Sequence, residues 1–386
     1  MFEFKIKHTQ KKGLARTGVF LTPHGEIHTP IFMPVGTKAT VKTLSQNDLK
    51  NLGAEIILAN TYHLYLRPGE KLIKKMGGLH KWISYKSPIL TDSGGYQVFS
   101  LGQKKFSEDK NKIKNLVRID GDGVTFKSIL DGDLHYFTPE KAMQIQHDLG
   151  ADIIMAFDEC APADSSKKYF TEASARTHSW ALRCKKEHEK LSKRSTQKQA
   201  LFGIVQGGVF KDLRVKSAKF INELNFEGNA IGGLSVGESK PQMTSMIEAV
   251  IPHLSKNKPR YLMGVGTPED IFEAIERGID MFDCVHPTRM ARHGAFWTNE
   301  GRFSIMNERF KADKSPLLKG CECEACKAYS RSYIRHLFFE QELLGPRMTS
   351  IHNLHFLLNL VREIRHHIEK DTFPKFKKDF LRKFKK

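Results

Sequence analysis

Eight short apolar runs recur along the 386-residue chain, and longer stretches with helix signals separate most of them. Each run ends in polar or glycine residues, a pattern typical of buried strands, and Thr267 followed by Pro268 marks a helix start. Regular alternation of strand and helix predicts the α/β class and a (β/α)8 barrel. The predicted strands cover residues 31–35, 56–59, 89–91, 153–157, 201–205, 229–232, 261–264 and 281–285, and the predicted helices cover 139–149, 170–190, 240–253 and 268–277.

Residue types with chemical functions follow most of the predicted strands. In (β/α)8 barrels the active site is assembled from residues at the C-terminal ends of several strands. Two carboxylates able to flank one sugar carbon, with an amide and a third carboxylate able to bind a base edge, indicate cleavage of an N-glycosidic bond. Glycines among them let the backbone approach a planar ligand. The segments are 60–63, 92–97, 158–160, 206–208, 232–234, 264–266 and 283–286.

Three cysteines within six residues, followed by a downstream histidine, predict one tetrahedral Zn²⁺ site. Four nitrogen and sulfur ligands leave no position open for water, so this zinc would be structural. Disulfides within the cluster are disfavoured, because a Cys-x-Cys bridge is strained. His355 is the alternative fourth ligand, and the neighbouring Ile351 and Leu354 favour His352. The predicted ligands are Cys321, Cys323, Cys326 and His352.

The charge balance indicates a polyanionic partner. The chain has 62 Lys and Arg against 43 Asp and Glu, a net charge of +19. Neutralising phosphates releases counterions, so nucleic acid is the leading partner class; the alternatives are a generally basic proteome or a basic face that repels other proteins. Residues 104–114 predict a lysine-rich loop. In the basic segment 375–386, Phe376, Phe380 and Phe384 predict an amphipathic helix that packs on the body of the protein.

Composition favours a cytoplasmic protein with no membrane contact. Hydrophobic residues make up 40% of the chain, enough for a large core, but no apolar stretch approaches the roughly 18 residues that a membrane span needs. The first residues do not have the pattern of a signal peptide. Cys160, Cys184 and Cys284 are scattered along the chain, which favours reduced thiols.

Five motifs occur in order before the cysteine cluster, at residues 91–97, 157–160, 205–208, 232–238 and 282–285. Together they resemble those of bacterial tRNA-guanine transglycosylases, the queuine or preQ1 tRNA-ribosyltransferases, and the similarity covers nearly the whole chain. The resemblance implies a homodimer that exchanges guanine at wobble position 34 of tRNAs with a GUN anticodon (Asp, Asn, His, Tyr) for preQ1, through a covalent glycosyl-enzyme intermediate in queuosine biosynthesis. It also implies a catalytic barrel over 1–300, with a lysine-rich inserted loop near 103–120, and a zinc-binding subdomain over 301–386 whose helices complete the barrel.

The resemblance assigns the chemical steps to two aspartates. Asp283 resembles the nucleophile that attacks C1′ of the ribose, and Asp92 resembles the general acid/base. Replacing one base by another with retained configuration requires two inversions, which agrees with a carboxylate nucleophile. Taken singly, each aspartate would more simply be an N-cap or a salt-bridged loop residue.

Further residues are assigned by the resemblance to base and tRNA recognition. Asp158 and Gln206, with the backbone of Gly233 and Leu234, would select guanine over adenine, because the wrong edge leaves buried polar groups unpaired. Val236 would exclude queuine, since the eukaryotic enzymes that use queuine have glycine there. The remaining base-site residues are Tyr96 and Met263, which would sandwich the ring, with Cys160 and Glu238, and the tRNA-binding residues are Arg289 and Arg292.

Some residues near the site have no clear place in this assignment. Met290 and His293 stand where polar residues are expected in the family, and Glu159 has no role beyond pairing with a basic neighbour. Two other functions are weighed. A non-catalytic tRNA-binding subunit is expected to lack Asp283 or Asp92, and both are present. A glycosidase or nucleoside hydrolase using the same carboxylates explains neither the charge of +19 nor the zinc cluster.

Overall fold

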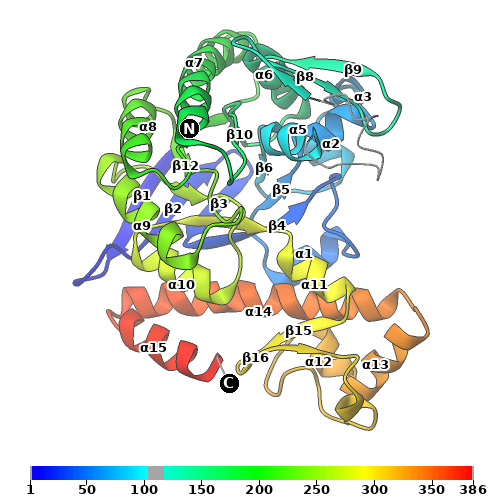
Figure 1. The fold of residues 1–386 in the computed structure, drawn as a ribbon. Helices are drawn as coiled ribbons and strands as arrows, with labels where there is room; N and C mark the ends of the chain where they lie inside the picture. Colours follow the sequence, from blue (N-terminus) through cyan, green and yellow to red (C-terminus); the bar gives the residue numbers. More distant parts are fainter. Residues whose placement is uncertain (1, 103–116, 385–386) are drawn as a thin grey trace.

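The computed structural model describes residues 2–102 and 117–384, and its centre is a closed barrel of eight parallel strands (Figure 1). The barrel confirms the predicted α/β class and (β/α)8 architecture, and each predicted strand overlaps one of its strands. Pairing of β14 with β4, in register Asp283 to Met33, joins the last strand to the first. In chain order the strands are β4 (Ile31–Gly36), β5 (Ile57–Ala59), β6 (Ile89–Thr91), β10 (Ile153–Met155), β11 (Ala200–Val205), β12 (Gly228–Ile231), β13 (Arg260–Leu262) and β14 (Met281–Cys284).

Helices between consecutive strands form the outer layer (Figure 1). The four predicted helices are confirmed, and Thr267 caps its helix by accepting a hydrogen bond from the backbone N–H of Asp270. Their bounds, with those of α1, α8 and the short helices after β5 and β6, are α1 (Gln46–Leu52), α2 (Thr61–Leu66), α3 (Glu70–Lys75), α4 (Leu79–Trp82), α5 (Gly95–Gly102), α6 (Pro139–Leu149), α7 (Lys167–Ser192), α8 (Lys211–Glu223), α9 (Lys240–Val250) with the 3-10 turn Ile251–His253, and α10 (Pro268–Glu276).

Two three-stranded antiparallel sheets flank the barrel, and neither was predicted. The first contains β1 (Glu3–Thr9), β2 (Arg16–Thr22) and β3 (Gly25–Thr29). Its Phe20 packs 5.8 Å from the ring of Phe202, so this sheet covers the N-terminal ends of the barrel strands. The second sheet contains β7 (Val117–Ile119), β8 (Val124–Lys127) and β9 (Leu134–Phe137). The predicted lysine-rich loop at 104–114 lies outside the described residues.

The C-terminal helices pack directly against the barrel. The longest, α14 (Leu344–Glu369), contacts β4, α1 and α11 (His286–Arg292), and Figure 1 shows it running across one side of the barrel. Phe380 and Phe384 of α15 (Phe373–Phe384) pack against Phe272 and Phe356, which confirms the predicted amphipathic helix. Between α11 and α14 lie β15 (Ala295–Thr298), β16 (Gly301–Ser304), the 3-10 turn Glu308–Phe310, α12 (Glu324–Ala328) and α13 (Arg331–Phe339).

No helix within residues 2–102 and 117–384 is both long enough and apolar enough to cross a bilayer.

Candidate active site and metal centre

Barrel closure brings the predicted catalytic and base-binding residues to one end of the molecule. Each lies at or just after the end of a different parallel strand. Asp283 is the second-last residue of β14, and the others follow their strands: Asp92 after β6, Asp158 after β10, Gln206 after β11, Gly233 after β12 and Met263 after β13. The C-terminal ends of parallel barrel strands meet at one mouth, where (β/α)8 enzymes carry their active sites.

Asp283 is held by two donors on one carboxylate oxygen. The hydroxyl of Tyr261 donates to Oδ1 at 2.5 Å, and the backbone N–H of Gly264 donates to the same atom at 2.7 Å. Burial raises the pKa of Asp283, and both hydrogen bonds act against that rise. With Oδ1 occupied, Oδ2 is the oxygen available to react. Tyr261 was predicted only as part of a strand; alternation along β13 puts it on the same face as Met263.

Asp92 lies in a different environment from Asp283. Its Oδ1 accepts from the backbone N–H groups of Thr61 at 2.8 Å and Gly94 at 3.2 Å, and Oδ2 accepts from the side-chain amide of Asn60. Burial raises the pKa of Asp92 to about 7, and the negative charge of Asp283 acts in the same direction. A carboxyl group with this pKa exchanges its proton near neutral pH, as a general acid/base must.

The third aspartate forms a buried polar chain. Asp158 accepts from the hydroxyl of Ser93 at 3.0 Å and from the side-chain amide of Gln206 at 2.6 Å. Burial raises the pKa of Asp158 to about 6, and these two hydrogen bonds oppose the rise. An acceptor beside an amide, both buried, suits a ligand edge with adjacent N–H donors.

The loop after β12 is fastened from two sides. Glu238 accepts from the backbone N–H groups of Ser235 and, at 3.1 Å, Val236. From the other side the Arg214 guanidinium donates to the carbonyl oxygens of Gly232 at 2.7 Å and Gly233 at 2.9 Å. The sequence did not predict a role for Arg214, because an arginine in the first turns of a helix is normally exposed to solvent.

The other predicted base-site residues differ in exposure. Tyr96, at the start of α5, is 52% exposed, so a large part of its side chain is free to stack on a ligand. Met263 is half-buried and packs against the core inside the barrel. Leu234 is buried, while Val236 and Cys160 are half-buried. Burial raises the pKa of the Cys160 thiol to about 12, so this thiol is neutral.

A cluster of cations surrounds the predicted tRNA-binding arginines. Arg289 is exposed and Arg292 is half-buried on α11. Burial and the charges of Arg292, Lys38 and Arg289 lower the pKa of Lys42, so these four groups form one positive field. Burial, followed by Lys38 and Lys42, also lowers the pKa of His63. Lys38 and Lys42 lie in the loop after β4 and were not predicted.

Two of the unassigned residues have structural explanations. Met290 is buried and belongs to the main hydrophobic core, whereas His293 is exposed. Glu159 is buried and pairs with Arg176, whose Nε lies 2.6 Å from Oε2, and it also accepts from the Tyr169 hydroxyl at 2.7 Å. The expected pairing of Glu159 with a basic neighbour is therefore confirmed.

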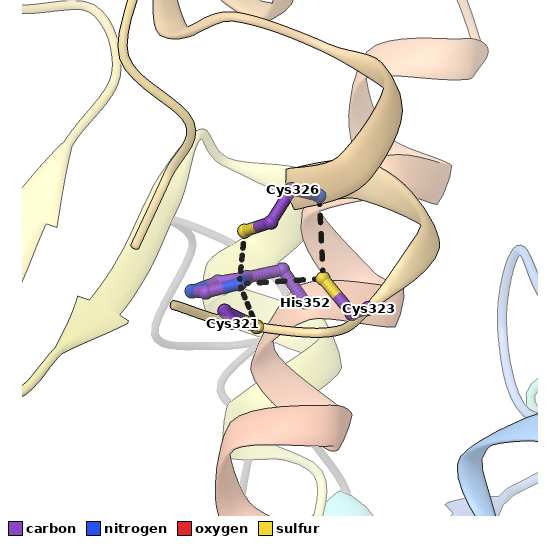
Figure 2. Close-up of side chains that lie close together, drawn as sticks. All are labelled: Cys321, Cys323, Cys326 and His352. Carbon is purple, nitrogen blue, oxygen red and sulfur yellow. Dashed lines mark hydrogen bonds between the residues drawn. The ribbon is translucent and has the colours of Figure 1, made fainter. Parts of the chain in front are cut away.

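The four predicted zinc ligands converge on one point (Figure 2). Cys321 and Cys323 precede α12, Cys326 lies in α12, and His352 lies in α14. The His352 Nδ1 atom lies 3.8, 3.7 and 3.3 Å from the sulfurs of Cys321, Cys323 and Cys326. Bond lengths of tetrahedral Zn²⁺ place such ligand atoms about 3.5–3.8 Å apart. Nε2 of His352 lies 2.7 Å from the Trp297 carbonyl, which orients Nδ1 towards the sulfurs.

The geometry favours His352 over the alternative ligand. His352 is fully buried and lies near all three sulfurs. Among the described residues, His355 lies near only one of the three sulfurs, with Nδ1 3.5 Å from Cys321 Sγ. The donor set therefore fits a closed, four-coordinate zinc site, as the sequence predicts.

A second group of possible metal ligands has unsuitable geometry. His24 Nδ1 and His80 Nε2 lie 2.7 and 3.1 Å from the two oxygens of Asp152. The two imidazole rings are stacked, 3.5 Å apart and 11° from parallel. Imidazole binds a metal in the plane of its ring, so parallel stacked rings cannot both bind one ion well. The group is better described as two histidines that contact one carboxylate, with a hydrogen bond between His24 and Asp152.

Together, a (β/α)8 barrel with three carboxylates at its mouth and a Cys3His group are typical of one class of enzyme that acts on nucleobases. The family model described as Queuine tRNA-ribosyltransferase matches residues 10–386. The chain is 52% identical over 381 residues to the Queuine tRNA-ribosyltransferase of Halothermothrix orenii, covering 99% of this chain and 97% of that protein. It is 50% identical to the proteins of the same name from Desulforamulus reducens, over 99% of this chain and 98% of that one, and Fusobacterium nucleatum, over 98% and 97%. The chain belongs to the queuine tRNA-ribosyltransferase family.

Proposed function

We propose that the protein is a tRNA-guanine transglycosylase that replaces guanine at wobble position 34 of GUN-anticodon tRNAs by preQ1. Family membership supports base exchange on tRNA in queuosine biosynthesis. The observation that carries the chemical proposal is the pair of aspartates at the barrel mouth, of which Asp283 has one oxygen tied down and Asp92 a pKa of about 7.

The proposed reaction has two displacements at C1′ of the ribose. In the first, ionised Asp283 forms a bond to C1′ through Oδ2, the bond to guanine N9 breaks, and protonated Asp92 supplies a proton to the departing base. In the second, Asp92 removes the N9 proton of preQ1, N9 attacks C1′, and Asp283 leaves as a carboxylate. Asp92 thus returns to its protonated form, and the sugar keeps its configuration.

Base recognition is assigned to the buried polar chain and the loop after β12. Asp158 would accept from N1–H and the 2-amino group of guanine or preQ1, with Gln206 holding and supplementing that carboxylate. The backbone N–H groups of Gly233 and Leu234 would donate to O6. Tyr96 and Met263 would contact the two ring faces, and Cys160, Val236 and Glu238 would shape the rest of the pocket.

The anticodon loop is proposed to bind over the cation cluster. Arg289 and Arg292 would contact the uridines that flank the target nucleotide, and Lys38 and Lys42 add positive charge at the same rim. Single-stranded loops expose base edges that such side chains can reach.

The metal is proposed to be one structural Zn²⁺ per subunit, bound by Cys321, Cys323, Cys326 and His352. It would stabilise the segment between β16 and α14. We also propose a homodimer, supported by exposed apolar side chains within this segment. Tyr333 is 41%, Phe339 51% and Leu343 81% exposed.

Incubation of the protein with radiolabelled guanine and unmodified GUN-anticodon tRNA tests the proposal. Incorporation of label into tRNA is expected, with competition by preQ1. Binding of tRNA without incorporation would favour a non-catalytic subunit, and release of guanine without incorporation would favour a hydrolase. A tRNA whose position 34 is not guanine serves as the negative control.

A further inference from the structure

Arg214 is a fully buried arginine that donates only to backbone carbonyl groups within the described part of the chain. It lies on α8 with 0% exposure. Nε donates to the Gly208 carbonyl at 2.7 Å, Nη1 to Val205 at 3.1 Å and Gly232 at 2.7 Å, and Nη2 to Gly233 at 2.9 Å. No carboxylate among residues 2–102 and 117–384 forms a salt bridge with it.

Burying the Arg214 guanidinium is energetically unfavourable unless other interactions compensate for its lost hydration. A buried charge without an opposite charge carries a large desolvation penalty, and burial lowers the pKa of Arg214 to about 10. The four carbonyl groups compensate the guanidinium by hydrogen bonding. They belong to the segments that leave β11 and β12, so Arg214 fastens two neighbouring strand ends together at the barrel mouth.

The planar trans peptide makes these hydrogen bonds directional. Within one peptide unit the C=O and N–H bonds point in opposite directions. Arg214 holds the carbonyls of Gly232 and Gly233, so the N–H groups of the same two peptides, which belong to Gly233 and Leu234, point away from the guanidinium. One side chain thus sets the direction of two consecutive donors.

The surrounding contacts leave this loop little freedom. Gly233 has φ of +61°, and a Cβ on it would meet Oε1 of Gln206 at 2.4 Å. The loop therefore packs on the amide that donates to Asp158. The guanidinium also lies close to the Cys160 thiol, and close enough to Glu238 for the carboxylate charge to raise its pKa. Arg214 is linked in this way to every part of the proposed base pocket except the ring-stacking residues.

We propose that Arg214 is a positioning residue for base selection, which turns the N–H groups of Gly233 and Leu234 towards O6 of the bound base. This inference rests on the proposed base exchange and names the residue that builds its O6-binding donors. Its positive charge would reinforce them, because it lies behind the peptides that face a partly negative oxygen. Asp158 would contact the N–H groups of the base. The negative carboxylate and the positive guanidinium would then act on opposite ends of the same edge of the base.

The test compares guanine with 6-thioguanine in wild-type protein, Arg214→Met and Arg214→Lys. The thio base keeps N1–H and the 2-amino group, but sulfur at position 6 accepts hydrogen bonds poorly. Losing two aligned donors should raise KM for guanine about 10- to 100-fold in Arg214→Met, with tRNA affinity unchanged. The wild-type preference for guanine over 6-thioguanine in kcat/KM should fall towards one. This ratio is independent of the fraction of folded protein, because both bases are measured on one preparation.

Arg260→Met is the matched control. Arg260 is also buried and donates to backbone carbonyls, those of Gly278 and Leu254, but it begins β13 at the opposite end of the barrel. Its substitution should lower stability and leave the base ratio unchanged. In Arg214→Ala, added guanidinium ion at millimolar concentration should restore part of the base affinity. Arg214→Lys keeps the positive charge but lacks the planar set of guanidinium donors, so its base affinity should be lower than that of Arg214→Ala with added guanidinium ion.

Three results distinguish failure of the inference from failure of the proposed function. If wild-type protein exchanges guanine, but Arg214→Met keeps the wild-type KM and base ratio, Arg214 does not position the donors and the inference is wrong. A wild-type ratio near one would also refute it. If wild-type protein incorporates no base into tRNA, the proposed function fails, and the inference fails with it.

Discussion

The pKa of Asp92 makes a quantitative prediction about stability and pH. An aspartate whose folded-state pKa is raised stabilises the fold while it is protonated in both states, below its unfolded value of 3.8. That contribution is lost as the pH rises through the folded value of about 7, because the folded state must then hold a buried charge. Replacing Asp92 by asparagine removes this loss. The advantage of the Asp92→Asn protein should therefore grow between about pH 4 and pH 7 and then level off.

The size of the effect follows from the shift. Each pH unit between the two pKa values changes the free energy of unfolding by about 1.4 kcal/mol, so the whole change is at most about 4 kcal/mol. Part of it belongs to Asp283, whose own charge becomes easier to hold when its neighbour is neutral. Asparagine also places an amide N–H group against the side-chain amide of Asn60, whose Oδ1 already caps α2 through His63. This conflict is independent of pH and shifts the whole curve without changing its slope.

Chemical denaturation of both proteins at pH 5, 6, 7 and 8, with the difference plotted against pH, measures the slope. Asp313→Asn is the control, since hydrogen bonds from Ser315 and Arg331 lower the pKa of Asp313 and its difference curve should stay flat above pH 5. A flat Asp92→Asn curve, or one that falls with pH, would show that three hydrogen bonds keep Asp92 ionised and would refute its role as an acid near neutral pH.

Three further predictions concern the nucleophile, the metal and the base pocket. Asp283→Asn should abolish base exchange and the covalent tRNA adduct on denaturing gels while tRNA binding stays within a few-fold, since an amide cannot act as nucleophile; persistent turnover would contradict the assignment. Cys323→Ala, or removal of zinc by a chelator, should lower Tm by several degrees and leave the choice of base unchanged, whereas equal Tm values with and without metal would exclude a structural role. Val236→Gly should increase the use of queuine relative to preQ1 by about tenfold or more, because overlap in a packed pocket costs about 1–3 kcal/mol; efficient use of queuine by the wild-type protein would show that the pocket opens differently.

Local patterns were sufficient to predict the barrel. A strand buried on both sides must be apolar along its whole length, and 153–155 or 201–205 therefore stand out from the amphipathic helices between them. The metal ligands were predictable for a related reason, since three thiols in six residues are already neighbours before the chain folds. The β1–β3 sheet was missed although Pro23 and Gly25 mark the turn between its last two strands, because its first strand offers only Phe4 and Ile6 as apolar positions.

The sequence by itself determined which residues lie at strand ends. A buried strand requires a run of apolar residues that are adjacent in the chain, so its end is visible in the sequence. The tertiary structure alone decided which distant groups share one environment. The pKa of Asp92 depends on burial and on a charge contributed by β14, and the cation field depends on Lys38 and Lys42 meeting α11. Arg214 shows this most clearly, because its four carbonyl partners belong to the ends of β11 and β12, which become neighbours only when these two strands pair. Electrostatic fields and hydrogen bonds act through space, and no periodicity along the chain records them.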